Sequence, residues 1–554
     1  MNTTKQRSLW SWIPSLYFAE GIPYIIVMFV ASDMYKTLGI SNAVLAFWTG
    51  LLYLPWVIKP LWSPFVDMVS TKRNWIFWMQ LALAVMFIGV SISLHLPWWF
   101  PMTIFFLWGM AFSSSTHDIA ADGFYILALN EHDQAFFTGI RSTFYRLAMI
   151  AGLGLLGIIT GVIIDNTGLG SVDVNVKAVQ LVEASTPVTM DDIPVPGNTD
   201  DDPRILIYPP DLNIAYAGQN AVDTANVYFV LSSAPEEPVV MAFGQKKGSQ
   251  DITLITSGVV EFNADNWNQP QRQTLKVGSN LREPADAVFV ASAGDIPFGW
   301  SVSLAFLGGL FVLFALYHRF VLPHPVRDGG VGEEERESYV EILVSFFRKD
   351  GIVPTLLFLL FYRFSEAQLT KMASPFLLDA RENGGLALSL TEKSFAYGTV
   401  GLIALLAGGI LGGFLASRHG LKKWIWWMAL SINLPNIVYV LMSYGMPSNL
   451  FVINSAIAIE QFGYGFGFTG YMLYMLYVAQ QGGKHETAHF ALTTGFMALG
   501  MMIPGMISGY IQELMGYQHF FIYVIVCTIP SFLALYFIKI DPGFGIKKTE
   551  SAKG

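Results

Sequence analysis

Ionisable side chains lie inside long apolar stretches of this sequence, where a charge is costly unless it has a partner or a task. Those in four of the stretches are Glu20; Asp118 and Asp122; Arg363, Glu366 and Lys371; and Glu460. Residues three or four positions apart share one helix face, so Asp118 lies with Asp122 and Arg363 lies with Glu366. A buried carboxylate can take up and release a proton, and a guanidinium can hold a carboxylate. This chemistry suits the movement of ions or solutes.

These residues also have structural explanations, which the sequence leaves open. Glu366 can neutralise Arg363 without touching a ligand, and Asp118 with Asp122 can form a salt-bridge latch near the cytoplasmic side. Arg146 has no acid nearby in the sequence and needs one from another helix, for which Asp122 is a candidate.

Three further polar residues receive separate interpretations. Gln461 follows Glu460 and precedes a row of glycines, where close helix packing and an open cavity are both reasonable. We expect Lys59 to reach towards the membrane surface or to cap its helix rather than to bind a ligand. We expect His489 to be structural. The sequence therefore predicts substrate contacts at Arg146, Arg363, Asp122 and Gln461, and proton coupling at Glu20, Asp118, Glu366 and Glu460.

The composition places the chain in a membrane. Of 554 residues, 53% are hydrophobic and 13% are charged, and the mean hydropathy is +0.47, which is too apolar for a soluble globular protein. Residues 165–295 hold 18 acidic and 7 basic residues, so the acidic balance belongs to one segment. The basic residues sit in short loops rather than on one face, which excludes nucleic acid as a partner. A single cysteine, Cys527, rules out an intrachain disulfide.

Twelve apolar segments are long enough to cross a bilayer of about 30 Å. They cover residues 12–34, 43–66, 75–94, 99–128, 138–164, 298–321, 353–378, 395–416, 424–443, 449–479, 486–511 and 519–539. The predicted organisation is spans one to five in 1–165, an insert in 166–296, span six in 297–324, a linker in 325–350, spans seven to twelve in 351–541 and a tail in 542–554. The N-terminal stretch shows no cleavage site and is expected to be retained as the first span.

Basic residues in the short loops indicate the orientation. Those expected on the cytoplasmic side are Lys5, Arg7, Lys72, Arg73, Arg327, Arg336, Arg348, Lys349, Arg418, Lys422, Lys423, Lys547 and Lys548. Both termini are then cytoplasmic, and the insert is periplasmic in a bacterial inner membrane. The second and eighth spans each end in a short basic turn before a tryptophan, Trp75 or Trp424, which suggests two related six-helix halves. Such halves are typical of major facilitator transporters, whose first, fourth, seventh and tenth helices are expected to line the cavity.

The insert has a different pattern. Short alternating runs such as 227–231, 239–243, 253–256 and 274–277, separated by Pro, Gly, Asn and Asp, predict a β-sandwich. The run VEFNADNWNQPQRQTLKV resembles Calx-β and related Ig-like modules. The acidic residues Asp191, Asp192, Asp200, Asp201 and Asp202 could collect calcium, but a solvated connector is favoured, and no metal or cofactor is predicted. A periplasmic partner for this domain is an open expectation.

The motifs around the charged residues resemble the muropeptide permease (AmpG-like) branch of the major facilitator superfamily, which is grouped with acetyl-CoA transporters. The motifs are YFAEGIPY, IKPLWSPFVD, THDIAADGF, YRLAM, FYRFSEA, IEQFGYGFG and HETAHFALTTGFMALG. The resemblance implies proton-linked import of N-acetylglucosaminyl anhydro-muropeptides from periplasm to cytoplasm for cell-wall recycling. Glu20, His117 and His489 depart from the residues usual in that branch, as does the insert.

Two alternatives to this transporter remain open. One is a major facilitator transporter of another sugar, peptide or acyl-CoA-like anion, and the other is a membrane sensor whose insert reads the periplasm. The longest segment expected on the cytoplasmic side has about 30 residues, too few for a signalling domain, which disfavours the sensor. An enzyme is not expected, because no nucleophile, base and oxyanion set stands out and no GxxxxGK[ST] motif is present.

Overall fold

The computed structural model describes residues 8–129, 131–180, 184–186, 188–197, 202–215, 224–235, 239–249, 251–256, 258–278, 281, 283–325, 339–481 and 486–544. The chain divides into two compact units. One is a helical bundle formed by Met1–Ile159, Trp300–Leu378 and Leu388–Gly554, and the other is a β-rich unit formed by Thr160–Gly299 with Asp379–Ala387. Several predicted cytoplasmic basic residues (Lys5, Arg7, Arg327, Arg336, Lys547 and Lys548) lie outside the described residues.

The helices before the insert account for the first five predicted spans. They are α1 (Ile13–Ile25), α2 (Ala31–Thr37), α3 (Asn42–Leu51), α4 (Leu54–Val69), α5 (Lys72–Ser93), α6 (Trp99–Ala128), α7 (Glu131–Met149) and α8 (Gly157–Asn166). After the insert, α9 (Ile296–Val321) forms the sixth span. The segment predicted at 99–128 coincides with α6.

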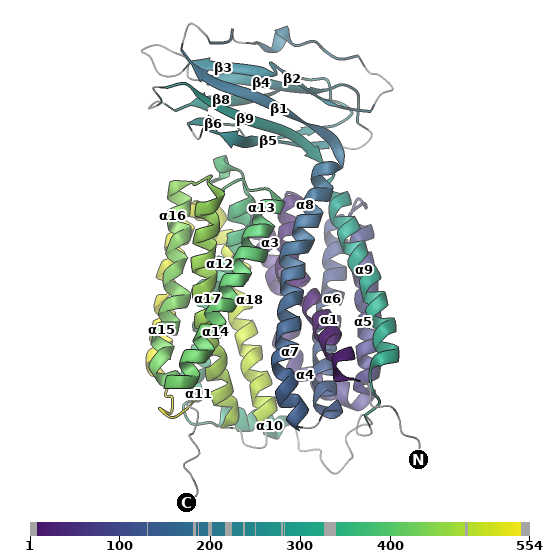
Figure 1. Cartoon of the computed structure of the whole chain (residues 1–554), viewed down its shortest axis with the longest axis vertical. Coiled ribbons are helices and arrows are strands. Elements are labelled where there is room, and N and C mark those ends of the chain that lie inside the picture. The colour runs from purple at the N-terminus through teal and green to yellow at the C-terminus, as the bar shows by residue number, and fades with distance from the viewer. Residues whose placement is uncertain are drawn as a thin grey trace, which may run out of the picture. The chain divides into compact units, whose positions relative to one another are not determined.

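The helices of the second half follow the same scheme. They are α10 (Tyr339–Phe347), α11 (Ile352–Phe361), α12 (Phe364–Leu378), α13 (Leu390–Phe395), α14 (Leu402–His419), α15 (Leu421–Asn433), α16 (Ile437–Gly445), α17 (Leu450–Gln480), α18 (Glu486–Val526) and α19 (Ile529–Phe537). In Figure 1, α3 and α13 lie at one end of the bundle, the α13 end, and α10 lies at the other, the α10 end.

Nine helical stretches within the described residues are long and apolar enough to cross a membrane. The 30-residue α6 and the 31-residue α17 are also long enough, at about 1.5 Å per residue. The longest stretch, Ala488–Phe537, contains Gly516 in the left-handed region (φ 72°), where one helix ends and another begins, so it supplies two crossings. The described residues therefore accommodate the twelve predicted crossings of a multi-pass membrane protein.

Several crossings are interrupted near their middle. Turns at Leu52–Tyr53 and Tyr362–Arg363 separate α3 from α4 and α11 from α12. Wider π-helical turns occupy Ile26–Val30, Ile150–Leu156 and Ala396–Gly401. Backbone irregularity at membrane depth is tolerated where it is buried in protein or lines a cavity, so these interruptions mark the centre of the bundle as the place to look for a site.

The β-rich unit has the predicted sandwich form. Its strands are β1 (Gly168–Val179), β2 (Ile205–Tyr208), β3 (Asp211–Ala215), β4 (Thr224–Leu231), β5 (Val239–Gly248), β6 (Ile252–Leu254), β7 (Val259–Phe262), β8 (Gln271–Val277) and β9 (Ala285–Gly294). One sheet has the order β3-β1-β9-β5-β7 and the other β2-β4-β8-β6. All described ladders are antiparallel except β1 with β3.

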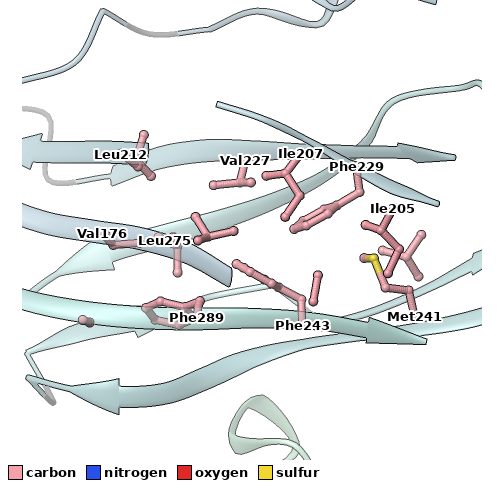
Figure 2. Packing of buried hydrophobic residues seen from close by; sticks show 14 of the residues in the cluster. Val176, Ile205, Ile207, Leu212, Val227, Phe229, Met241, Phe243, Leu275 and Phe289 are labelled. Atoms are coloured by element: carbon pink, nitrogen blue, oxygen red, sulfur yellow. The ribbon is translucent and has the colours of Figure 1, made fainter. Parts of the chain in front are cut away.

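The two sheets enclose one apolar core. Alternate residues point inward, as the period of two requires, and Phe229 of β4 meets Phe243 of β5 with ring centroids 4.8 Å apart. Figure 2 shows Phe229 and Ile207 from one sheet facing Phe243 and Phe289 from the other. The β-sandwich prediction is confirmed in this sense, whereas the resemblance to Calx-β modules stays a prediction.

One carboxylate in the acidic connector of the insert has a structural role. Asp192 accepts hydrogen bonds from the backbone N–H (2.9 Å) and hydroxyl (2.7 Å) of Thr189. These two bonds lower the pKa of the Asp192 carboxyl. No group of three candidate metal ligands occurs among the residues that the structure describes, and Asp200 and Asp201 lie outside them.

The insert joins the chain through a hydrogen-bonded ladder rather than through loose linkers. One residue separates α8 from β1, one separates β9 from α9, and Gly168 pairs with Gly294. Gly168 has φ 82°, and a Cβ there would collide with the carbonyl oxygen of Ala293, so this position needs glycine. The start and end of the insert are thereby held next to each other.

Removal of the insert should leave a protein that still folds and inserts. Leu169 lies directly opposite Ala293, so replacing residues 170–292 by Asn-Gly makes a two-residue hairpin turn between paired residues. We expect membrane insertion and uptake at saturating substrate to be retained, as measured by fractionation and by transport. A matched variant with the same excision and a ten-residue Gly/Ser linker separates turn geometry from domain loss. Loss of uptake in both correctly inserted variants would make the insert part of the transport machinery.

Candidate functional site

The interruption between α11 and α12 places Arg363 at the centre of the second half. Its Nη2 donates to the Tyr464 hydroxyl of α17 (2.8 Å), and its guanidinium lies 5.2 Å and 4.9 Å from the ring centroids of Tyr464 and Phe468. The residue is 8% exposed and its buried Nε has no hydrogen-bond partner. A guanidinium held between rings with a free N–H is suited to receive a carboxylate oxygen.

Glu366 lies near Arg363 and Glu460 lies near Glu366, and neither carboxyl group forms a direct ion pair with Arg363 in the described residues. Glu366 accepts from the Thr370 hydroxyl (2.7 Å), and its second oxygen is buried without a partner. Glu460, 3% exposed, accepts two contacts from Gln461 Nε2 (3.2 and 2.9 Å) and interacts electrostatically with Glu366. Glu366 and Arg363 nevertheless interact electrostatically, so the explanation of Glu366 as a neutralising partner of Arg363 stays open beside a proton-coupling role. Gln461 uses its amide to position Glu460.

The first half holds a second charged cluster. Asp118 of α6 pairs with Lys59 of α4, and the two side chains are 21% and 23% exposed. Glu20, 6% exposed, lies close enough to Asp118 to interact with it electrostatically and has one buried oxygen without a partner. Two neighbouring buried carboxylates repel each other unless one carries a proton, so this pair is a candidate place for proton binding. The expectation that Lys59 reaches the membrane surface was wrong, because Asp118 compensates its charge inside the bundle.

Asp122, one turn beyond Asp118, has a partner that the sequence reasoning missed. Its Oδ1 pairs with Nη2 of Arg141 (2.8 Å) and accepts from the Tyr17 hydroxyl (3.3 Å). The guanidinium of Arg141 lies 4.5 Å from the Tyr17 ring centroid. The sequence analysis had suggested Arg146 as the partner of Asp122. Arg146 lies five positions after Arg141 on α7 and therefore on another face of that helix. The missed signal was that positions 141, 145 and 148 share the face of α7 that packs on α1.

Aromatic residues lie between the two clusters. Tyr24 interacts electrostatically with both Asp118 and Arg363, and its ring centroid is 5.4 Å from Trp56 and 6.4 Å from Tyr145. The predicted site residues thus form two groups, Glu20, Asp118 and Asp122 in the first half and Arg363, Glu366, Glu460 and Gln461 in the second. No contact among the described residues joins Arg146 to either group.

A buried ion pair links the two halves near the α13 end. Asp33 of α2 pairs with Lys393 of α13, both side chains being 4% exposed, and Asp33 also accepts from the Ser374 hydroxyl of α12. Nearby, the backbones of the two halves meet where a Cβ on Gly154 would lie 3.0 Å from the Gly398 carbonyl oxygen. Sequence analysis missed Asp33 and Lys393 because both lie near the ends of predicted spans, where charges are common.

The fold defines a class: this is a multi-pass membrane protein with the major facilitator fold. Its structure resembles the D-xylose–proton symporter (TM-score 0.58, 8% identity, 97% of this chain and 98% of that one). It also resembles the nucleoside transporter NupG (0.55, 12%, 96% and 100%). A third likeness is to a bacterial homolog of the human lysosomal transporter Spinster in an inward-facing, unoccupied conformation (0.53, 14%, 95% and 94%). At these identities the likeness shows the fold alone.

Sequence similarity is more specific and supports the resemblance to AmpG-like transporters. The BT1 family model matches residues 19–274. "Putative transporter AmpG 1" of Rickettsia bellii is 29% identical over 189 residues, which are 34% of this chain and 44% of the relative. "Putative transporter AmpG 2" of Rickettsia prowazekii is 23% identical over 210 residues, 37% of this chain and 48% of the relative. The matched region spans less than half the length of these relatives.

Proposed function

We propose that the protein is a proton-coupled secondary transporter that imports muropeptides, or related amino-sugar or peptide compounds, for cell-wall recycling. It acts as a permease and not as an enzyme. It lies in a bacterial inner membrane with both termini in the cytoplasm and the insert in the periplasm, where a partner could reach it. The AmpG-named relatives and the basic loops support this proposal.

The observation that carries the proposal furthest is the environment of Arg363. Muropeptides combine sugar rings with peptide carboxylates, and Arg363 offers an unpaired N–H within an aromatic surface. Aromatic faces suit sugar rings, and a guanidinium suits a carboxylate. Glu20, Asp118, Glu366 and Glu460 are the proposed proton-coupling groups. Asp122 acts by positioning Arg141, and Gln461 acts by positioning Glu460. A contact of Arg146 with the substrate is also part of the proposal.

The proposal is tested by uptake of a labelled anhydro-muropeptide into a strain that lacks its own permease. We expect accumulation that collapses when the proton gradient is dissipated. Unlabelled muropeptide should compete, whereas simple sugars, free peptides and acetyl-CoA should compete weakly. Strong competition by one of the latter would identify another transported class, and absence of any uptake by correctly inserted protein would overturn the proposal.

A further inference from the structure

Lys371 is a buried cation that the charge pairs described above do not use. It lies in α12 and is 5% exposed. Its Nζ donates to the Thr49 hydroxyl (3.0 Å) and to the Met28 carbonyl (3.5 Å), and it lies 5.4 Å from the ring centroid of Tyr53. All these partners are neutral. Thr49 also donates to the Leu45 carbonyl, so it is already engaged in the backbone of its own helix.

Other cations of the bundle show that this arrangement is unusual for the molecule. Lys59, Arg141 and Lys393 each have a carboxylate partner. Within the described part of the chain, Lys371 and Arg363 are buried cations without a direct carboxylate partner, and both belong to the interrupted seventh crossing. Arg363 has Glu366 within electrostatic range, whereas the recorded partners of Lys371 are neutral, and ionisable groups inside spanning segments commonly mark a ligand or ion pathway.

The two cations face one region of the bundle. Tyr53, at the interruption between α3 and α4, interacts electrostatically with Arg363 and lies beside the Lys371 amino group. A Cβ on Gly505 of α18 would lie 3.2 Å from Lys371 Cγ, so a residue without a side chain leaves room for the lysine stem. Residues of both halves therefore surround Lys371, as expected of a group at a shared ligand site.

We propose that Lys371 is a second anion-binding residue of the transport site, and that the ligand carries two anionic groups held separately by Arg363 and Lys371. Eight residues separate the two on the chain, which is a rise of about 12 Å along a helix. Three to four extended peptide units span roughly this distance. A sugar bearing a short acidic peptide meets this requirement, whereas a monosaccharide or a small monocarboxylate does not. This inference rests on the proposed function and narrows its substrate.

The test measures binding of two probes to purified protein in detergent: an anhydro-muropeptide with free peptide carboxylates, and the same compound with these carboxylates converted to amides. Lys371→Gln should weaken binding of the acidic probe roughly 10- to 100-fold and leave binding of the amidated probe within about twofold, because one charge-assisted bond is lost. Lys371→Arg should restore most of the preference for the acidic probe. Lys36→Gln is the control, because it removes a lysine amino group that donates to Asn42 Oδ1 (2.8 Å) at the end of α2, outside the region around Tyr53 and Arg363.

A double variant tests whether Arg363 and Lys371 hold one anionic group together or one anionic group each. Arg363→Lys combined with Lys371→Gln should lose the sum of the two single effects in free energy if each residue holds its own carboxylate. Equal weakening of both probes by Lys371→Gln, with a lower unfolding temperature, would assign Lys371 a structural role and overturn the inference. If the unaltered protein binds neither probe, the proposed function itself fails, which is a distinguishable result.

Discussion

Replacing Asp33 by Ala should destabilise the bundle by about 3–5 kcal/mol, because it leaves the Lys393 charge buried without a counter-ion. Both side chains are 4% exposed, so water cannot replace the lost partner. The double variant Asp33→Ala with Lys393→Met should recover much of the loss, since an apolar side chain of similar size does not pay for desolvating a charge. The measurement is the midpoint of denaturant unfolding in detergent for the single and double variants.

A matched control is available in the insert. Asp173 and Lys246 form the same kind of pair (2.9 Å), but their side chains are 46% and 51% exposed. Asp173→Ala should therefore cost about 1 kcal/mol or less. Equal effects of the two aspartate substitutions, or no recovery in the double variant, would contradict a stabilising buried pair between the two halves.

Glu460→Gln should abolish proton-driven uptake while leaving counterflow of preloaded substrate. Accumulation requires a group that takes a proton on one side and releases it on the other, whereas counterflow requires only the ligand site. The substitution keeps the size of the side chain, and an amide at this position can still accept from Gln461 Nε2, so the local structure should be retained. The measurement compares both transport modes in proteoliposomes.

Glu341→Gln is the control for this experiment. Glu341 lies exposed in α10, away from the two central clusters, and its substitution should change neither mode. Loss of both modes in Glu460→Gln would point to a role in binding or folding, and loss of neither would remove Glu460 from the coupling mechanism.

Much of the bundle was predictable because an apolar crossing is encoded locally. The desolvation cost of backbone groups forces each crossing into a helix, so residue type along about twenty positions is sufficient. The predicted 298–321 and 353–378 lie within two residues of α9 and of the α11–α12 stretch. The two interruptions do not show in hydropathy: the one at Leu52–Tyr53 has a separate local signal, Pro55 in the first turn of α4, whereas the sequence around Tyr362–Arg363 contains no proline or glycine.

The candidate site was predicted in its residue types rather than in its pairings. Glu20, Asp118 and Asp122 stood out in the sequence because charges in apolar runs are rare, and the spacing put Asp118 and Asp122 on one helix face. Their cationic partners were not identified, since Lys59 was expected to cap its helix or reach the membrane surface and Arg141 stands near the start of its crossing. Which acid meets which base is decided by helix packing, as the choice of Arg141 over Arg146 by Asp122 illustrates.

The ladder between β1 and β9 has a consequence for the order in which the protein is made. On the nascent chain β1 follows α8 directly, but the antiparallel partner of β1 is β9, the last strand of the insert. Gly168 therefore cannot pair until Gly294 has been synthesised. Pairings so distant in sequence form slowly, and until then one edge of β1 stays open to unwanted partners. The residues that close the sheet lead directly into α9. Completion of the soluble domain and entry of the sixth crossing into the membrane are therefore consecutive events on one short stretch of nascent chain.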